Sequence, residues 1–338
     1  MKIAILAPIS WRTPPRKYGP WEQVASNIAE GLVENGIDVT LFATGDSITQ
    51  GKLDYVSEKS YSEDAEMDPK VWECLHISHL MEQADKFDLI HNNYDFLPLT
   101  YSRLIKTPML TTIHGFSSKK IIEVYKRYND TNSYVSISNS DRSPELDYMA
   151  TVYNGINTDG FTFNAKPKDY LLFFGRIHPE KGTFESIQIA KQSGRKLIIA
   201  GLIQDQQYFD KKIKPFVNGD DIVYLGNAGP KERDVLLSEA YALLHPISFA
   251  EPFGLSVAEA MLCGTPVIAF NKGSMPELIQ NGETGFLVND IYEAIASVNS
   301  IDTINRQFCN EYAISKFSRQ KMVEGYLEVY KQILNTKN

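Results

Sequence analysis

The sequence predicts an α/β protein with two parallel-sheet domains, and three observations support this. Short apolar runs alternate with longer amphipathic stretches, the alternation occurs in two series of similar size, and a segment rich in Gly, Asn, Pro and Lys, "VYNGINTDGFTFNAKPKD", separates the series. The chain has 338 residues, and a domain typically holds roughly 100–200. Two domains are therefore expected.

The first series opens with the strand-like run "KIAILAP", followed by an amphipathic stretch and the strand-like "DVTLFAT". In the stretch between them, Val24, Ile28, Leu32 and Val33 recur at helical spacing, and Asn35-Gly36 is typical of a helix end. A strand, a helix and a strand in that order predict a right-handed crossover between parallel strands. Further candidate strands are "FDLIHNN", "PMLTTIHG", "SYVSISN" and "ATVYNGI".

The second series alternates in the same way. The strand "DYLLFFGRI", the helix "GTFESIQIAKQSG" and the strand "KLIIAGL" come first, and then "DIVYLGN", the helix "KERDVLLSEA", the strand "YALLHPI", a helix around Glu259 and the strand "TPVIAF". The tail "SRQKMVEGYLEVYKQIL" predicts a last amphipathic helix. We expect domains over 1–155 and 156–315, with 316–338 forming the terminal helix.

Composition excludes several classes of protein. The formal net charge of −8 argues against a general nucleic-acid-binding surface, although a local basic cleft remains open. Cys74, Cys263 and Cys309 are odd in number and lack CxxC spacing, so neither a disulfide framework nor a zinc site is indicated. The N-terminal apolar run is too short for a secretory signal, and no apolar segment reaches the roughly 18–20 residues of a membrane span. A cytoplasmic protein is expected, with peripheral membrane attachment left open and the oligomeric state unspecified.

The loops after the first-domain strands carry candidate functional residues. The loop "PISWRTPPRKYGPWEQ" holds Arg12, Arg16 and Lys17 and ends in Gly19 before a helix whose free N–H groups could bind an anion. A solvated surface loop fits this pattern equally well. His114 follows a later strand, but a lone histidine there is more often structural than catalytic.

Three further histidines of this half carry weaker signals. His91 lies in "LIHNN" and has the same structural interpretation with less support for a functional one. His76 and His79, three residues apart, could form a metal pair on a helix, but no third ligand is evident. A helix surface is the favoured interpretation of that pair.

The second domain opens with a basic loop, "FFGRIHPEKG", directly after a buried strand. Arg176 and Lys181 suit a diphosphate, because Arg can bind two oxygens at once and Lys supplies a point charge. Two exposed surface cations are the competing interpretation. The strand on one side and the Gly-initiated helix on the other favour phosphate.

The segment "FAEPFGLSVAEAMLCGTPVIAF" places two carboxylates around a helix start. Gly254-Leu255-Ser256 predicts a helix that runs to about Leu262 and stops at Gly264, so its N-terminus could bind an anion. Glu251 precedes that helix and Glu259 lies about one turn into it, so the two carboxylates reach different parts of one ligand. A capping Glu251 with a solvated Glu259 is the alternative, and it does not explain the Pro-Phe-Gly turn.

With these motifs in order, the sequence resembles the retaining GT-B-fold glycosyltransferases of family 4. The spacing Glu251-x7-Glu259, "GRIHPEKG", "VYNGINTDGF", "NGETGFLV" and the N-terminal "PPRKYGPWEQVASNIAEGLVENGIDVTLFATGDS" carry the resemblance, which covers essentially the whole chain. It implies the GT-B fold: two Rossmann-like domains facing a cleft, with the C-terminal helix returning to the N-terminal domain.

The resemblance also implies roles for individual residues. Glu251 would bind hydroxyls of the transferred sugar, Arg176 and Lys181 would neutralise the diphosphate, and His114 would lie against the sugar. Each remaining residue is implied to bind either the donor or the acceptor. On the donor side these are Glu259 at the ribose, Phe253, Gly254, Leu255 and Ser256 at the helix start, Asn227 and Ala228 at the base, and Gly19; on the acceptor side they are Arg12, Arg16, Lys17, Tyr94 and Asp95.

The implied activity is metal-independent, front-face, retaining transfer of a hexose from a nucleotide-diphosphate sugar to an acceptor hydroxyl. A UDP-sugar is the favoured donor and a GDP-sugar is possible, with no cofactor and no convincing Asp-x-Asp motif for a metal. The acceptor could be a saccharide, a lipid-linked saccharide or a small molecule, and the cations Arg12, Arg16 and Lys17 indicate a polar or anionic one. A phosphorylase, a nucleotide-sugar hydrolase or epimerase, and a non-catalytic sugar-nucleotide binder remain as alternatives.

One departure from the family pattern bears on the N-terminal loop. The family commonly has Gly-Gly where this sequence has Gly19-Pro20. Proline has no N–H, so one potential donor to a phosphate or acceptor is lost there.

Overall fold

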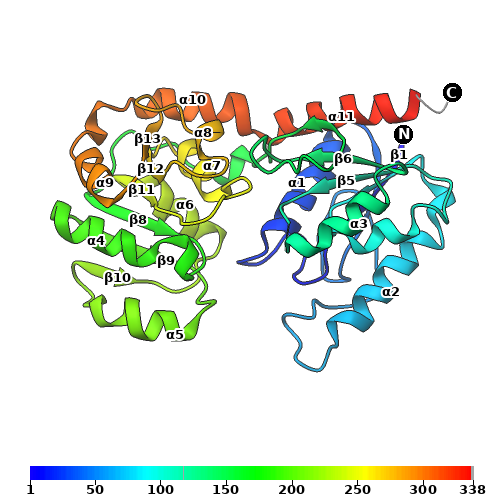
Figure 1. The fold of residues 1–338 in the computed structure, drawn as a ribbon, viewed down its shortest axis with the longest axis horizontal. Coiled ribbons are helices and arrows are strands. Elements are labelled where there is room, and N and C mark those ends of the chain that lie inside the picture. The colour runs from blue at the N-terminus through cyan, green and yellow to red at the C-terminus, as the bar shows by residue number, and fades with distance from the viewer. Residues whose placement is uncertain (117, 336–338) are drawn as a thin grey trace. The chain divides into compact units, whose positions relative to one another are not determined.

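The computed structural model describes residues 1–116 and 118–335. The chain divides into two compact units, which we call the first unit (Met1–Gly155 with Arg319–Asn338) and the second unit (Ile156–Ser318). The C-terminal helix therefore belongs with the N-terminal part of the chain, as the resemblance implies. Figure 1 shows the fold of both units.

The first unit contains a seven-stranded sheet in the order β3-β2-β1-β4-β5-β6-β7, and all its pairings are parallel. The central strand β1 is almost entirely apolar and buried, as expected for a parallel sheet covered on both faces. The strands are β1 Lys2–Leu6, β2 Asp38–Phe42, β3 Lys52–Asp54, β4 Leu89–Asn92, β5 Met109–Ile113, β6 Asn132–Ser136 and β7 Tyr148–Thr151.

The helices of this unit are α1 Pro20–Glu34, α2 Pro69–Met81, α3 Ile122–Arg127 and α11 Arg319–Asn335. Helices α1 and α11 lie side by side (dark blue and red in Figure 1) and pack closely at Gly31, where a Cβ would come within 2.5 Å of Val323 Cγ2. From α11 the Tyr326 and Tyr330 hydroxyls make hydrogen bonds of 2.8 and 2.7 Å to Thr112 Oγ1 and His91 Nδ1. Helix α11 is thereby fixed to the sheet as well as to α1.

The second unit contains a six-stranded parallel sheet in the order β10-β9-β8-β11-β12-β13. Its strands are β8 Tyr170–Phe174, β9 Lys196–Ala200, β10 Ile222–Tyr224, β11 Ala242–His245, β12 Val267–Phe270 and β13 Gly285–Val288. Its helices are α4 Thr183–Ser193, α5 Gln206–Tyr208, α6 Pro230–Glu239, α7 Leu255–Leu262, α8 Met275–Leu278, α9 Ile291–Val298 and α10 Arg306–Phe317.

Short turns of 3-10 helix complete the fold. They span Ala84–Lys86, Leu97–Tyr101, Lys119–Ile121, Thr158–Gly160, Pro179–Lys181, Lys214–Phe216 and Ile301–Thr303, and Phe209–Ile213 forms one turn of π-helix. Among the residues that the structure describes, no helix is both long and apolar enough to cross a membrane.

The α/β class with two parallel sheets is confirmed, but one strand is shifted. The run "ATVYNGI" predicts a strand to Ile156, whereas β7 ends at Thr151. Beyond it, Gly155 is held by helices: its carbonyl accepts a hydrogen bond of 2.8 Å from the Asn27 side chain, and its N–H contacts Met322 Sδ at 3.0 Å. These contacts satisfy the backbone groups of Gly155, and the next residue, Ile156, forms only an isolated parallel bridge with Ser318.

Candidate functional site

Both sheets have a point where the strand order reverses. It lies between β1 and β4 in the first unit and between β8 and β11 in the second. Ligands of open α/β sheets bind in the crevice at such a point, outside the carboxyl ends of the strands. In the second unit, Lys181 lies in the loop that follows β8 and Glu251 in the loop that follows β11.

Glycines let these two loops touch. Gly182, with φ 76°, lies so close to the β11 loop that a Cβ would come within 2.0 Å of the Pro246 carbonyl oxygen. A Cβ on Gly273, after β12, would come within 2.3 Å of the Glu251 nitrogen. Side chains at these positions would push the loops apart, so the glycines bring Lys181 to Glu251.

Lys181 and Glu251 form a buried ion pair. The Lys181 ammonium donates to Glu251 Oε2, and the two side chains are only 14% and 13% exposed. The ammonium also lies 4.7 Å from the centre of the Phe249 ring. Burial raises the pKa of Glu251, but the His245 imidazole and the Lys181 charge lower it, and the pKa is about 2. The carboxylate is therefore ionised throughout the physiological range.

His245 also faces this pair, and the sequence reasoning missed it. It is the last residue of β11, and its Nε2 lies 3.7 Å from Glu251 Oε2. Burial lowers the pKa of His245, so the ring is neutral at pH 7. A polar residue closing the apolar run "YALLHPI" was the signal that could have identified it.

Helix α7 begins at Leu255, in the predicted Gly254-Leu255-Ser256 segment, and Glu251 lies in the loop before it. Gly254 caps it with φ 94°, and its first N–H groups have no partner within the helix, so they form a site for an anion or for hydroxyls. Ser274 holds the segment that leads from Glu251 into this helix. Its N–H donates to the Glu251 carbonyl at 3.0 Å and its Oγ donates to the Phe253 carbonyl at 2.6 Å. Leu255 and Ser256 form the first turn.

Glu259 is buried in the second turn of α7 and pairs with Arg233 of α6. Its Oε1 lies 3.0 Å from Arg233 Nη1, and the residue is 5% exposed. Burial raises the pKa of Glu259 and the Arg233 charge opposes that shift. The alternative of a solvated Glu259 is therefore wrong. Arg233 had no sequence signal, because "KERDVLLSEA" reads as an ordinary charged helix.

Two other predicted donor-side segments lie at the same carboxyl edge. Arg176 follows β8 and donates to the side-chain oxygen of Gln204. Asn227 and Ala228 follow β10 and precede α6. The structure thus places Arg176, Asn227 and Ala228 in loops at the carboxyl ends of the strands of the second sheet.

In the first unit, His114 follows β5 and is buried. Its Nε2 donates to Asn93 Oδ1 at 3.0 Å, and its ring stacks on Trp21 with centroids 5.8 Å apart. Burial lowers the pKa of His114 to about 3, so the ring is neutral. With the proton on Nε2, Nδ1 is a buried acceptor with no hydrogen-bond partner among the described residues.

The other candidate histidines are structural. His91 is bonded on both nitrogens, to Tyr330 and Thr112. His76 Nε2 donates to the Ala7 carbonyl at 2.9 Å, and His79 Nε2 lies 2.7 Å from Asp54 Oδ1. His76 and His79 thus have different partners, which argues against a metal pair. The helix-surface interpretation is wrong for His76, which is fully buried, whereas His79 is half-buried.

The loop between β1 and α1 ends at a buried carboxyl group. Pro20 is the first residue of α1, where its missing N–H would have had no partner within the helix. Glu22, two residues on, accepts a 3.0 Å hydrogen bond from the Trp11 N–H, and burial raises its pKa to about 7. Gly19 lies beside this carboxyl group, since a Cβ there would be 3.1 Å from Glu22 Oε2.

The predicted acceptor-side residues mostly have partners within the first unit. Arg12 donates to the Pro14 carbonyl at 3.0 Å, and Asp95 accepts from the Tyr125 hydroxyl at 2.6 Å. Tyr94 is buried and Lys17 is exposed. Asp95 has φ 113°, a strained conformation for a non-glycine residue, at the point where the strand order reverses.

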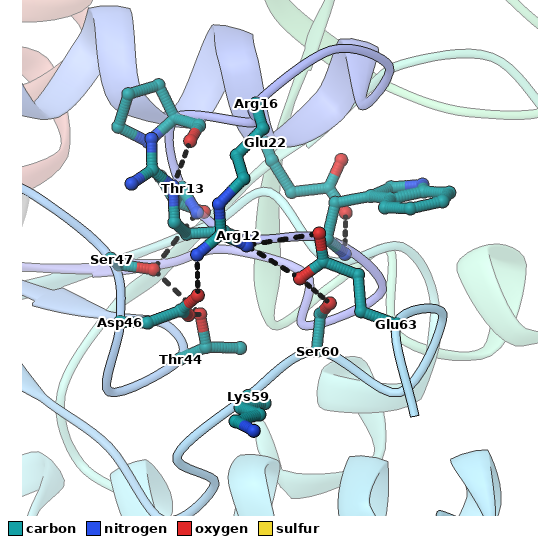
Figure 2. A network of polar contacts seen from close by, with 12 residues as sticks. Arg12, Thr13, Arg16, Glu22, Thr44, Asp46, Ser47, Lys59, Ser60 and Glu63 are labelled. Carbon is teal, nitrogen blue, oxygen red and sulfur yellow. Dashed lines mark hydrogen bonds and ion pairs between the residues drawn. The ribbon is translucent and has the colours of Figure 1, made fainter. Parts of the chain in front are cut away.

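Arg16 is held by two carboxylates, as Figure 2 shows. Its guanidinium lies 3.0 Å from Asp46 Oδ2 and 2.9 Å from Glu63 Oε2. Thr44 donates to Asp46 and Ser60 to Glu63, so both carboxylates are fixed. These groups border an open hollow of about 650 Å³, lined by Arg16, Gly45, Asp46, Glu58, Lys59 and Glu63.

Comparisons with known families cover both units. The family described as "Glycosyltransferase Family 4" matches residues 21–159, and "Glycosyl transferases group 1" matches residues 158–308. An uncharacterized glycosyltransferase of Methanocaldococcus jannaschii is 25% identical over 338 aligned positions, which cover 85% of each chain.

Solved structures agree on the fold. A glycosyltransferase involved in Avilamycin A biosynthesis has a TM-score of 0.74 and 23% identity, covering 99% of this chain and 98% of its own. The Anabaena protein HepE, solved in complex with UDP and glucose, has a TM-score of 0.75 and 18% identity, covering 98% of this chain and all of its own.

Proposed function

The chain belongs to the GT-B glycosyltransferases of the family 4 type, and from that premise we propose that it transfers a hexose from a UDP-sugar to an acceptor hydroxyl, with retention of configuration and without a metal ion. The observation that carries the proposal is the Lys181–Glu251 pair. Two charged groups from the loops after β8 and β11 are buried together where α/β sheets bind ligands. Burying charges is costly, and a ligand that needs both groups accounts for their placement.

Four charged groups of the second unit have proposed tasks on the donor. Glu251, ionised and held by Lys181, accepts hydrogen bonds from sugar hydroxyls. Lys181, Arg176 and the N-terminus of α7 stabilise the negative charge that develops on the leaving diphosphate. Glu259 binds the ribose. Fixed cations and a helix end supply the stabilisation that a divalent ion supplies in other transferases.

The bond changes balance without a covalent enzyme intermediate. The bond between the anomeric carbon and the diphosphate oxygen breaks, and its electron pair stays on that oxygen. The acceptor oxygen attacks from the same face, and its proton passes to the departing phosphate oxygen. Glu251 does not act as a nucleophile in this scheme, since it orients the sugar. His114 Nδ1, a buried acceptor, takes a hydrogen bond from a sugar hydroxyl.

The acceptor is proposed to be an uncharged, hydroxyl-rich saccharide bound at the hollow of the first unit. The hollow holds two cations, Arg16 and Lys59, and three carboxylates, so it has no excess of positive charge. The Arg16 guanidinium is already paired twice. Carboxylates and hydroxyls suit sugar hydroxyls better than an anionic group.

The donor test combines binding and turnover. UDP, UDP-sugars, GDP-sugars and ADP-sugars are screened by thermal shift, and UDP compounds are expected to raise the melting temperature most. Turnover of an α-linked UDP-hexose is then measured with neutral mono- and disaccharides, with and without EDTA. We expect an α-linked product by NMR and a rate that EDTA does not change.

Other results identify the competing functions. Sugar release that requires inorganic phosphate indicates a phosphorylase, and release without any acceptor indicates a hydrolase. Donor binding with no turnover across the acceptor panel indicates a binding protein. A β-linked product or a loss of activity in EDTA contradicts the proposed stereochemistry or metal independence, respectively.

A further inference from the structure

His245 has an unpaired ring nitrogen pointed at the charged pair of the second unit. The residue is 5% exposed, and its Nε2 is buried with no hydrogen-bond partner among the described residues. The 3.7 Å between Nε2 and Glu251 Oε2 is too long for a hydrogen bond. Buried polar atoms are rarely left unpaired, so this nitrogen calls for an explanation.

His91 shows how a purely structural buried histidine is accommodated in the same chain. Its Nδ1 bonds the Tyr330 hydroxyl and its Nε2 bonds Thr112, each at 2.7 Å. His245 is equally buried, but its Nε2 faces a carboxylate that is already occupied. His76 also leaves a buried nitrogen, Nδ1, without a partner among the described residues, so the unpaired atom alone assigns no role. What bears on His245 is that its Nε2 faces an ion pair, which can supply a partner in another state of the protein.

Lys181 occupies the carboxylate oxygen that His245 faces. The ammonium donates to Glu251 Oε2, the same atom from which His245 Nε2 is 3.7 Å away. The charges that act on the imidazole are those of Glu251 and Lys181. A neutral imidazole with its proton on Nε2 is a donor, so it could replace the ammonium on this oxygen.

The proposed function gives Lys181 a second partner, and the inference rests on it. When Lys181 turns to the donor diphosphate, Glu251 loses its counter-ion in a site that is only 13% exposed. An ionised carboxylate left unpaired there would be strongly disfavoured and would lose its orientation. Another donor must take over for Glu251 to hold the sugar.

We propose that His245 is a positioning residue that donates its Nε2–H to Glu251 once Lys181 binds the diphosphate of the donor. A shift of about 1 Å brings Nε2 within hydrogen-bond distance of the carboxylate. The hydrogen bond from Lys181 to Glu251 breaks, the one from His245 forms, and no proton is transferred. His245 thereby keeps Glu251 ionised and directed at the transferred sugar, and it acts only when a diphosphate is bound.

Two amide variants separate this role from simple packing. The amide nitrogen of Gln reaches the position of His Nε2, whereas that of the shorter Asn reaches only the position of Nδ1. We expect His245→Gln to keep kcat within about 3-fold of the original, and His245→Asn and His245→Leu to lower it about 10- to 100-fold, the loss expected for a hydrogen bond to a charged group. Affinity for uridine, which lacks the diphosphate, is expected to stay unchanged in calorimetry, whereas affinity for UDP, which draws Lys181 away from Glu251, should fall in His245→Asn and His245→Leu.

Two outcomes overturn the inference. His245→Asn as active as the unsubstituted protein shows that no donor at Nε2 is needed. His245→Gln as impaired as His245→Leu, with an unchanged melting temperature, shows that the amide does not replace the imidazole.

A ligand-free measurement keeps this test distinct from that of the proposed function. Lys181→Met, or Lys181→Leu if the first does not fold, removes the ammonium from Glu251 and is expected to let His245 bond Glu251, so the Nε2–H proton of His245 should exchange slowly with water and give a downfield signal in NMR spectra. Absence of that signal in the folded variant overturns the inference even if the protein transfers no sugar. If the protein is inactive with every donor but the signal appears, the proposed function fails and the contact between His245 and Glu251 stands.

Discussion

The carboxyl edges of the two sheets hold their charges in opposite ways. In the second unit, Lys181 with Glu251 and Arg233 with Glu259 are paired in buried positions next to the start of α7. In the first unit, Arg16 is 53% exposed and makes ion pairs with Asp46 and Glu63 at the rim of an open hollow. Similar residue types therefore meet very different dielectric environments at equivalent ends of two parallel sheets.

The physical consequence differs between the two edges. A buried pair loses the solvation of both ions, so removing one partner leaves a charge that water cannot reach. An exposed pair is screened by solvent and contributes little to stability. The buried charges of the second unit therefore suit a ligand whose own charge must be neutralised. The hollow of the first unit presents positive and negative groups in nearly equal number.

The largest expected effect comes from breaking the buried pair. Lys181→Met and Glu251→Gln are each expected to lower transfer about 100-fold or more, because the proposed mechanism uses Lys181 to stabilise the leaving diphosphate and Glu251 to orient the sugar. Lys181→Met leaves a buried carboxylate and Glu251→Gln leaves a buried ammonium, so each should also lower the free energy of unfolding by about 3–5 kcal/mol. Urea denaturation and kcat measure the two effects.

The double variant tests whether the two effects have one cause. Carrying both substitutions, it should recover most of the lost stability while remaining inactive, since no charge is left unpaired. Lys52→Met removes an exposed partner of Asp38, 3.1 Å away in the first unit, and should leave the denaturation midpoint unchanged. Additive stability losses in the double variant would remove the distinction between the two edges.

Glu22 is the exception in the first unit, because it is a buried carboxyl group without a counter-ion among the groups that shift its pKa. Burial raises that pKa from 4.5 to about 7, while hydrogen bonds from its own N–H and that of Trp11 oppose the shift. Between these two values the folded protein binds a proton that the unfolded chain has released. Stability should therefore fall as the pH rises from about 4.5 to about 7, by on the order of 3 kcal/mol.

Glu22→Gln should abolish that dependence, since an amide does not titrate and its oxygen can still accept from Trp11. The free energy of unfolding is measured for both proteins at pH 5 and pH 8, and the gain of the variant over the original should be larger at pH 8. Equal differences at the two pH values would mean that Glu22 titrates alike in the folded and unfolded states.

The sequence was informative about elements and about which residue types follow which strands. Alternation identified both sheets, helix α1 and the C-terminal helix, because buried parallel strands and amphipathic helices have distinct periods. Strand β3 was missed because Lys52–Asp54 is too short for a period to show, and the short strand β13, Gly285–Val288, was missed as well. Contacts between loops that are far apart in the chain leave no such period in the sequence, so they could not be predicted in the same way.

The sequence did not predict which site residues contact one another, because these contacts join loops that are far apart in the chain. Lys181 and Glu251 were both named, but their bond depends on a loop contact at Gly182 that joins residues 70 positions apart. The sequence assigns Arg16 to acceptor binding, but its guanidinium already pairs with Asp46 and Glu63, which lie 30 and 47 residues further along the chain. A side chain's charge is visible in the sequence, but its partner is not.

The smallest expected effect concerns Arg16, and it tests whether the hollow of the first unit is closed to anions. If the guanidinium is committed to Asp46 and Glu63, Arg16→Met should only loosen these carboxylates. The KM for a neutral acceptor, glucose, and for its anionic counterpart, glucose 6-phosphate, should then rise alike, by up to about 5-fold. Donor KM and the denaturation midpoint should not change.

Arg103→Met provides the matched control, because Arg103 also forms an exposed ion pair in the first unit, 3.0 Å from Asp130, but does not line the hollow. It should leave both acceptor KM values unchanged. A selective loss with glucose 6-phosphate in Arg16→Met alone would show that Arg16 leaves its carboxylates to bind an anion. The exposed edge would then supply a charge to a substrate, as we propose for the buried edge, and the two sheets would differ only in how deeply their charges are buried.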